Sequence, residues 1–344
     1  MNFVYEALPM RVVFGDGALS RVPGEISFLR LENVLVLSGP RQEAVGKQVA
    51  EALGDRCAGL LPEAAMHVPV EVANRAREVA AELGADGCVA VGGGSAIGLG
   101  KAVALTHGLP VVAVPTTYAG SEMTPVWGLT ENGVKRTGRD PRVLPVSVVY
   151  DPSLTRSMPV GLAVTSGINA VAHAAEGRYA PDASPIVSLM AREGVRALLA
   201  ALPAIAGRPD DAGARADALY GAWLCGAVLG ATTMGLHHKL CHALGGTLNL
   251  PHAETHTVVL PHALAYNGAA EPSPAELWEL EGRLGTPRSL RELGMAEGDI
   301  DRIADQVASA TFPNPRPVTA EGLRELLHAA WSGREPSPHG QRRT

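Results

Sequence analysis

Histidines gather in one short stretch of this chain. Eleven are present in all, and the six that lie between Gly235 and Asn267 are His237, His238, His242, His252, His256 and His262. An imidazole gives or takes a proton near neutral pH, and it is also the commonest ligand for transition metals. The clustering therefore predicts proton transfer, metal binding or both.

The spacing of two pairs of polar residues predicts how they meet. His238 and His242 are four residues apart among good helix formers, so both rings leave one face of a helix. Asn169 and His173 have the same spacing in a second expected helix, which we expect to begin after Ser166 as its N-cap. Two such helices would enclose a small polar pocket between them.

A glycine-rich segment, VAVGGGSAIGLGK at 89–101, predicts a phosphate site. It follows a short β-rich run and opens a helix, where free backbone N–H groups and the helix dipole favour an anion. A plain strand-to-helix turn is the alternative, because the segment lacks the G-x-G-x-x-G pattern. The residues assigned to the cofactor here are Gly92, Gly93, Gly94 and Ser95.

Two other strand ends supply polar groups to the same expected site. Ligands of open α/β sheets bind beyond the carboxyl ends of the strands. We therefore add Thr116, Thr117 and Ser121 from the loop after one strand, and Ser38 and Gly39 from the end of an earlier one. No acidic residue follows Ser38 to bind a ribose 2′-hydroxyl, so use of both NADH and NADPH is expected, with Arg41 near a 2′-phosphate.

The elements that must position these residues change character near residue 152. Before it, β-rich runs at 33–38, 87–94, 110–115 and 145–152 alternate with helical stretches at 70–84 and 96–107, which predicts βαβ units and a parallel sheet. After it, Ala/Leu-rich segments at 186–205 and 214–229 predict successive helices. We expect an α/β dinucleotide-binding domain at 1–152, an all-helical catalytic domain at 153–333 and a flexible tail at 334–344.

Composition excludes several classes of function. The net charge is −6 and the basic residues are dispersed, which disfavours nucleic acid as a partner. No apolar run reaches the roughly 18 residues that span a bilayer, and the N-terminus lacks a signal-peptide pattern, so a cytoplasmic protein is expected. The basic run at 134–142 predicts a solvated hairpin, unless Arg139 or Arg142 reaches a carboxylate.

The order of motifs resembles the iron-containing (group III) alcohol dehydrogenase superfamily. The motifs are GGGS, PTT-x-x-GSE, DP, SG-x-NA-x-x-HA-x-E, H-x-x-x-H and a PH ten residues further on. The resemblance implies a dehydroquinate synthase-like architecture and a homodimer. Within the superfamily, TYAGSEMTP, VKRTGRDPRVLP and HHKLCHALGGTLNLPHAETHTVVLPHA resemble the maleylacetate reductases.

Carried over residue by residue, the resemblance also bears on metal binding. The three ligand histidines of metal-dependent members match His173, His238 and His252, and a further catalytic histidine matches His242. The aspartate ligand of those members is Asn169 here. A neutral amide is a much weaker ligand than a carboxylate, so we expect no catalytic metal; Fe or Zn would bind only if Asn169 serves as a ligand.

The resemblance implies a substrate and a reaction. The substrate is a small dicarboxylate oxo-acid, maleylacetate, whose conjugated C=C is reduced by NADH or NADPH to give 3-oxoadipate in the degradation of aromatic compounds. Hydride addition β to the ketone develops an enolate, which hydrogen-bond donors alone can stabilise. We assign His242 and His238 as donors or proton sources. The groups expected to help hold the dicarboxylate are His173, His237, His252 and Lys239.

Four other functions stay open at this point. A metal-dependent group III alcohol or polyol dehydrogenase would need bound metal, and a reductase of a related unsaturated oxo-acid would have a very similar sequence. A dehydroquinate synthase-like lyase would use NAD⁺ without net turnover. A non-catalytic binding protein is disfavoured, because binding alone does not call for so many proton-transfer groups.

Overall fold

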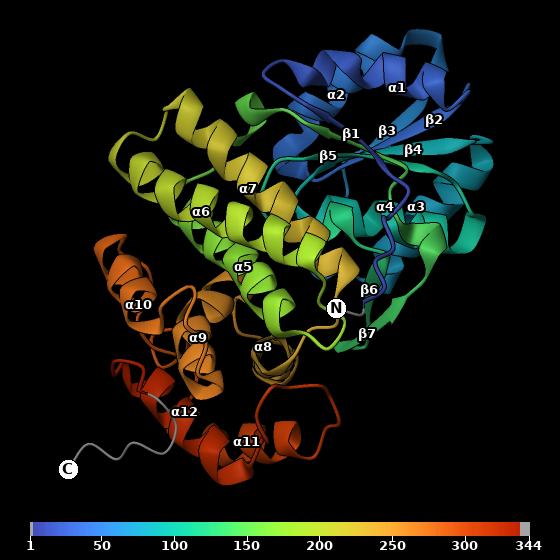
Figure 1. The fold of residues 1–344 in the computed structure, drawn as a ribbon. Coiled ribbons are helices and arrows are strands. Elements are labelled where there is room, and N and C mark those ends of the chain that lie inside the picture. Colours follow the sequence, from blue (N-terminus) through green and yellow to red (C-terminus); the bar gives the residue numbers. More distant parts are fainter. Residues whose placement is uncertain (1–2, 338–344) are drawn as a thin grey trace.

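A six-stranded parallel sheet forms the centre of the N-terminal half (Figure 1). The computed structural model describes residues 3–337, so residues 338–344 of the predicted tail lie outside it. The strands are β1 (Arg11–Phe14), β2 (Val34–Ser38), β3 (Cys57–Leu61), β4 (Gly87–Gly92), β5 (Val111–Pro115) and β8 (Ser147–Tyr150). Their order in the sheet is β1-β8-β5-β4-β2-β3. The predicted parallel sheet is confirmed, and β1 and β3 are additions to it.

Alternate residues of the central strands face two different helical layers. Val34 and Val36 of β2 pack with the helices α1 (Val22–Phe28) and α2 (Glu43–Leu53). Leu35 and Leu37 belong to the core on the other face, beneath α3 (Val70–Glu82) and α4 (Gly94–His107). Because both faces are covered, β2, β4, β5 and β8 are buried throughout, as their Val-rich sequences require.

The strand order reverses between β2 and β4. From β2 the chain moves outward to β3 and then returns to the other side of β2 to form β4. Both neighbours run parallel, with Ser38 paired to Val91 at their carboxyl ends. Ligands of doubly wound sheets bind beyond such a switch point. The glycine-rich turn at 92–94 and the Ser38–Gly39 pair therefore meet where the sequence places a dinucleotide.

A two-stranded hairpin projects from the sheet domain between β5 and β8. Its strands are β6 (Val126–Glu131) and β7 (Val134–Arg139), which pair antiparallel. The basic run predicted to form a solvated hairpin is its second strand. Arg139 donates to the carbonyl oxygen of Gly230, and the carboxylate that Arg142 reaches is that of Asp140.

Eight α-helices form the second half of the described chain. They are α5 (Val160–Tyr179), α6 (Pro185–Gly207), α7 (Ala212–Ala231), α8 (Leu236–Leu248), α9 (His252–Asn267), α10 (Pro274–Arg283), α11 (Ile300–Ala308) and α12 (Ala320–Ser332). Helix α5 lies against α6, α7 and α9 and is buried from Ala163 to Gly177. The predicted change from α/β to all-helical structure is confirmed, and the predicted boundary after residue 152 falls in the connection between β8 and α5.

The predicted N-cap of α5 is wrong. The helix begins at Val160, after Pro159, so Ser166 lies two turns inside it. Its buried hydroxyl accepts a hydrogen bond from the backbone N–H of Tyr118 instead. A tertiary contact between the two halves of the chain, rather than a cap, therefore explains this serine.

No single helix within residues 3–337 is long and apolar enough to cross a bilayer. Taken together, α7 and α8 have the length and the apolar composition of a span, but they meet at an angle of 95°.

Candidate active site

The switch point of the sheet carries unpartnered buried hydroxyls. The Oγ of Ser38 and the Oγ1 of Thr116 are buried without a hydrogen-bond partner among the described residues. Between them, Gly92 has a φ of 145°, and Gly93 is the N-cap of α4 without a side-chain cap. A Cβ at Gly93 would lie 2.9 Å from Cγ2 of Thr117, so only glycine leaves this approach open. Free N–H groups and orphaned hydroxyls fit a dinucleotide pyrophosphate.

We expect the Gly93→Val variant to lose most of its nucleotide affinity while it remains folded. The new side chain stands at the start of α4, where a phosphate must approach the backbone N–H groups, and it also collides with Thr117. NADH titration by fluorescence, alongside thermal unfolding, measures both effects. The double variant Gly93→Val/Thr117→Ala removes the collision but keeps the obstruction. If it binds NADH normally, the collision alone is responsible and the phosphate lies elsewhere.

Ser121 is held by a buried lysine. Lys101 of α4 is 1% exposed, and its ammonium donates to the carbonyl oxygens of Ser121, Thr124 and Val126. Burial lowers the pKa of this lysine to about 7, and the neighbouring Glu122 opposes the shift. These bonds tie the loop after β5 to α4, and the cofactor contact of Ser121 stays a prediction.

The same loop touches the histidine cluster. A Cβ at Gly120 would lie 3.3 Å from Nδ1 of His173 on α5. The rings of His173 and His238 are 5.2 Å apart between centroids, and those of His238 and His242 are 6.2 Å apart. Among the buried atoms of the cluster without a partner in the described residues are Oδ1 of Asn169, Nδ1 of His173 and Nε2 of His238. The structure thus brings together the two predicted pairs, Asn169 with His173 and His238 with His242, beside the loop that follows β5.

His237 does not face a substrate. Its side chain is fully buried, and its Nε2 lies 2.9 Å from Nδ1 of His256 and 3.7 Å from the sulfur of Cys241. Adjacent residues on a helix point in different directions, so His237 turns into the core while His238 turns to the site. The predicted role of His237 in holding a dicarboxylate is therefore corrected.

A glutamate that sequence reasoning missed organises the start of α8. Glu176 of α5 is 1% exposed and accepts backbone hydrogen bonds from Gly235, His237 and His238. Its Oε2 also lies 2.6 Å from Nδ1 of His238. The carboxylate caps the positive end of the helix and orients the imidazole, which leaves Nε2 of His238 toward the site. Its only sequence signal is the spacing of three residues after His173.

The environment keeps most of the cluster neutral. Burial is the main cause that lowers the pKa of His173, His237 and His256, with smaller effects from neighbouring histidines. Burial by surrounding protein atoms, then nearby positive groups, also lowers the pKa of His242 and His252, although both side chains keep solvent-exposed surface. A neutral imidazole still donates an N–H hydrogen bond, and it can polarise a carbonyl oxygen.

The residues at the family's metal position do not fit a tightly held dication. The ligands there would be neutral: the amide of Asn169 and the unprotonated imidazoles of His173, His238 and His252. No carboxylate replaces the missing aspartate. Within residues 3–337, one group of three or more His, Cys, Asp or Glu side chains has all its ligand atoms within 4.8 Å of one another. It consists of His237, Cys241 and His256. This group is buried and adjoins the family's position, because the ring of His256 lies 4.4 Å from that of His252 and 5.1 Å from that of His238 between centroids.

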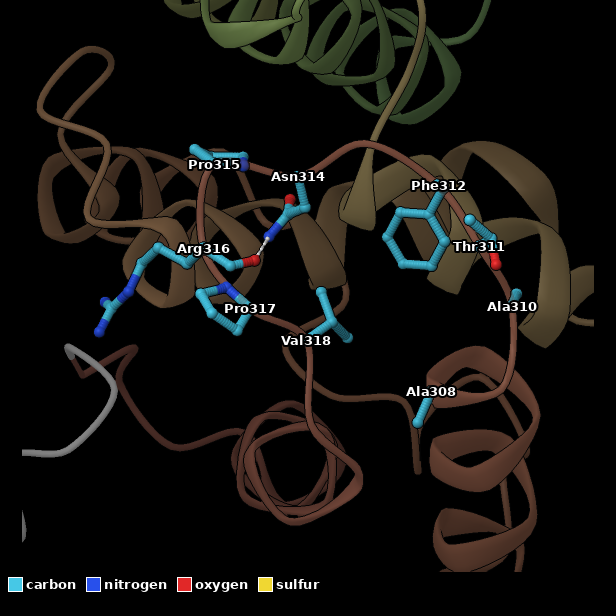
Figure 2. A pocket seen from close by; sticks show the side chains of 9 residues that line it. All are labelled: Ala308, Ala310, Thr311, Phe312, Asn314, Pro315, Arg316, Pro317 and Val318. Atoms are coloured by element: carbon cyan, nitrogen blue, oxygen red, sulfur yellow. Dashed lines mark hydrogen bonds between the residues drawn. The ribbon is translucent and has the colours of Figure 1, made fainter.

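A surface pocket of about 470 Å³ lies away from this chemistry. Figure 2 shows it between α11 and α12, lined by the loop that connects them, from Ala308 to Val318. In that loop Asn314 donates to the carbonyl oxygen of Arg316 and exchanges two amide hydrogen bonds with Asn267. No histidine and no residue of the nucleotide edge lines this pocket. The loop supports the start of α8 from behind, where the carbonyl of Pro313 packs against Gly235.

The sheet domain has a predicted dinucleotide site at its switch point. The helical domain places neutral histidines, which can donate hydrogen bonds or transfer protons, next to that site. This is the arrangement of a nicotinamide-dependent oxidoreductase. Residues 9–152 match the model of iron-containing alcohol dehydrogenases, and residues 163–276 match that of the C-terminal domain of the same family. The chain belongs to the iron-containing alcohol dehydrogenase family.

Its similar relatives share almost the full length. The chain is 54% identical to a maleylacetate reductase of Burkholderia cepacia, with 97% of this chain and 99% of that one covered. It is 52% identical to the maleylacetate reductase of Sphingobium indicum, over 98% of this chain and 99% of the relative. The crystal structure of maleylacetate reductase from Agrobacterium tumefaciens matches with a TM-score of 0.95 and 49% identity, over 98% and 100% of the two chains.

Proposed function

We propose that this enzyme reduces the conjugated C=C of maleylacetate to give 3-oxoadipate, with NADH or NADPH as the reductant. The observation that carries the proposal is the unpartnered buried oxygen of Asn169. By the family resemblance, this amide takes the position of the carboxylate ligand in metal-dependent members. A site of neutral imidazoles and one amide suits an anion that hydrogen bonds alone can stabilise. The names of the full-length relatives point to the same substrate.

The chain's own groups have three tasks in this reaction. A reduced nicotinamide, when bound, supplies a hydride to the carbon β to the ketone. The N–H of His242 stabilises the negative charge that moves onto the ketone oxygen, and Glu176 holds His238 so that its Nε2 faces the same site. A proton from His238 or His242, the two assigned proton sources, is added at the carbon α to the ketone and completes the saturated product. The polar groups at the switch point hold the dinucleotide so that its ring reaches this place.

Three substrates test the proposal. Oxidation of NADH by the purified enzyme is measured with maleylacetate, with a 4-oxo-2-enoate and with a simple ketone. Turnover of maleylacetate, with 3-oxoadipate as the product, supports the proposal. If NADH is oxidised no faster with maleylacetate than with buffer, the substrate is wrong, and faster reduction of the simple ketone would favour the alcohol dehydrogenase alternative. The same assay with NADPH compares the two cofactors.

Activity with maleylacetate is expected to survive EDTA, because no carboxylate ligand holds a metal at this position. The Asn169→Asp variant restores the carboxylate and is expected to bind Zn²⁺ or Fe²⁺ more tightly than the wild type, as metal analysis after dialysis would measure. Loss of wild-type activity in EDTA, recovered on addition of Fe²⁺ or Zn²⁺, would instead show that the Asn169 amide acts as a metal ligand.

We also infer from the family resemblance that the protein is a homodimer. Light scattering of the purified protein would test this inference.

A further inference from the structure

Lys135 is unusual among the basic side chains of the β6–β7 hairpin and the turn that follows. Within residues 3–337 its ammonium has no hydrogen bond or ion pair with the protein. The others are engaged: Arg136 with Glu131, Arg139 with the carbonyl oxygen of Gly230, and Arg142 with Asp140. Lys135 keeps solvent-exposed surface, so its ammonium is accessible to an anion from solution.

The hairpin turns Lys135 toward the helical domain. Alternation along β7 places Lys135, Thr137 and Arg139 on one face and Arg136 on the other. Arg139 reaches Gly230 at the end of α7, so the face that it shares with Lys135 is the one directed at the helices. Across the hairpin, a Cβ at Gly128 would lie 3.3 Å from Cε of Lys135. The missing side chain lets the lysine lie flat over β6.

The residue opposite Lys135 fastens the hairpin to a strained loop. Thr130 pairs with Lys135, donates its N–H to the carbonyl of Val68 and donates its hydroxyl to the carbonyl of His67 at 2.9 Å. His67 and Val68 have φ values of 64° and 48°, and a β-branched residue rarely adopts such a conformation. Strained backbone is often retained where it positions a functional group. Here it fixes His67 near Lys135.

The charge of Lys135 acts on histidines of both domains. After burial, the charge of Lys135 is among the causes that lower the pKa of His67, His242 and His252. Lys239 acts on His242 in the same way. No carboxylate is among the charges that shift the pKa of these histidines. The basic site, defined as His67, Lys135, Lys239, His242 and His252, therefore gathers cationic and N–H-donating groups from both domains without an acidic partner.

We propose that Lys135 binds one carboxylate of the substrate from the sheet-domain side, across from His242 and His252 on the helices. The inference rests on the proposed function and adds the residue that makes it specific for a dicarboxylate. An ammonium without a counter-ion is a strong site for an anion, and a dianion that bridges both domains would neutralise the basic site. His67 lies within the influence of the same charge and completes this side of the site.

The Lys135→Met variant tests the proposal, because methionine keeps much of the stem but removes the charge. The KM for maleylacetate is expected to rise about 10- to 100-fold, as for loss of a hydrogen bond to a charged group. The Kd for NADH and the unfolding temperature should stay unchanged, and Lys135→Arg should recover part of the affinity. Arg136→Gln, which alters the opposite face of the same strand, is the matched control and should leave KM within about twofold.

A binding measurement separates this inference from the proposed function. Calorimetric titration of the NADH-bound enzyme with adipate, an unreactive six-carbon dicarboxylate, needs no turnover. If the wild type fails to reduce maleylacetate but Lys135→Met weakens adipate binding, the proposed function falls and the carboxylate site stands. If the wild type reduces maleylacetate and Lys135→Met changes neither its KM nor adipate binding, the site is wrong and the function stands.

Discussion

Replacement of His242 by alanine is expected to lower kcat with maleylacetate by about 10²- to 10⁴-fold, with a much smaller change in KM. The ring is exposed at the site and is four residues from His238 on the same helix face. Its lowered pKa keeps it neutral at pH 7, so it acts as an N–H donor to the developing enolate rather than as a permanent cation. Groups that act on charge formed during the reaction affect the transition state more than the bound substrate.

The control is a partly exposed histidine outside the site. His328 on α12 is 45% exposed and lies 4.0 Å from Glu297, so His328→Ala is expected to leave both constants within about twofold. Steady-state kinetics with NADH held saturating gives kcat and KM separately. A His242→Ala enzyme that retains kcat and only binds substrate more weakly would make His242 an anchor for a carboxylate, similar to Lys135.

The Glu176→Gln variant is expected to lose both stability and activity. The carboxylate accepts hydrogen bonds on both oxygens, and an amide can accept on only one while its NH₂ group faces the N–H groups of α8. Loss of such a buried charged acceptor costs about 1.5–3 kcal/mol for each bond left unmade. We expect a fall of several degrees in Tm and a lower kcat, because Nδ1 of His238 loses the group that orients it.

Two further variants separate these effects. Glu193→Gln breaks an exposed pair with Arg196 on α6 and should change stability by less than about 0.5 kcal/mol. Glu176→Asp retains the charge, so its kcat should be higher than that of Glu176→Gln although the two variants have similar Tm values. Should Glu176→Gln retain wild-type kcat once the temperature is adjusted for its stability, the glutamate only caps α8 and does not position His238.

Much of the site could be predicted from the sequence, because the spacing of residues within one helix or strand determines which side chains share a face. The four-residue interval of His238 and His242 determines that both lie on one face, and the glycines at 92–94 determine that a backbone edge is open. These relations depend on the period of one element and need no knowledge of its neighbours. Ser166 shows the limit, because its hydroxyl is used by a contact with Tyr118 from a distant part of the chain.

The residues that were missed depend on tertiary arrangement. Glu176 becomes important only because the start of α8 lies against the end of α5, which no local pattern reveals. For the basic hairpin, sequence reasoning considered Arg139 and Arg142, whereas the structure turns Lys135 toward the histidines. The choice among them depends on hairpin register and on which face Arg139 attaches to α7. A shift of register by one residue would present Arg136 instead.

The basic site also affects how a substrate arrives. The chain carries a net charge of −6, so a dianionic molecule that diffuses toward most of its surface is repelled. At physiological ionic strength charges are screened beyond about 8 Å, and attraction by Lys135 and Lys239 acts only over the last part of the approach. Productive encounters are therefore restricted to a small solid angle around the junction of the two domains. The anionic remainder of the surface makes unproductive adsorption of the same dianion elsewhere on the enzyme unfavourable.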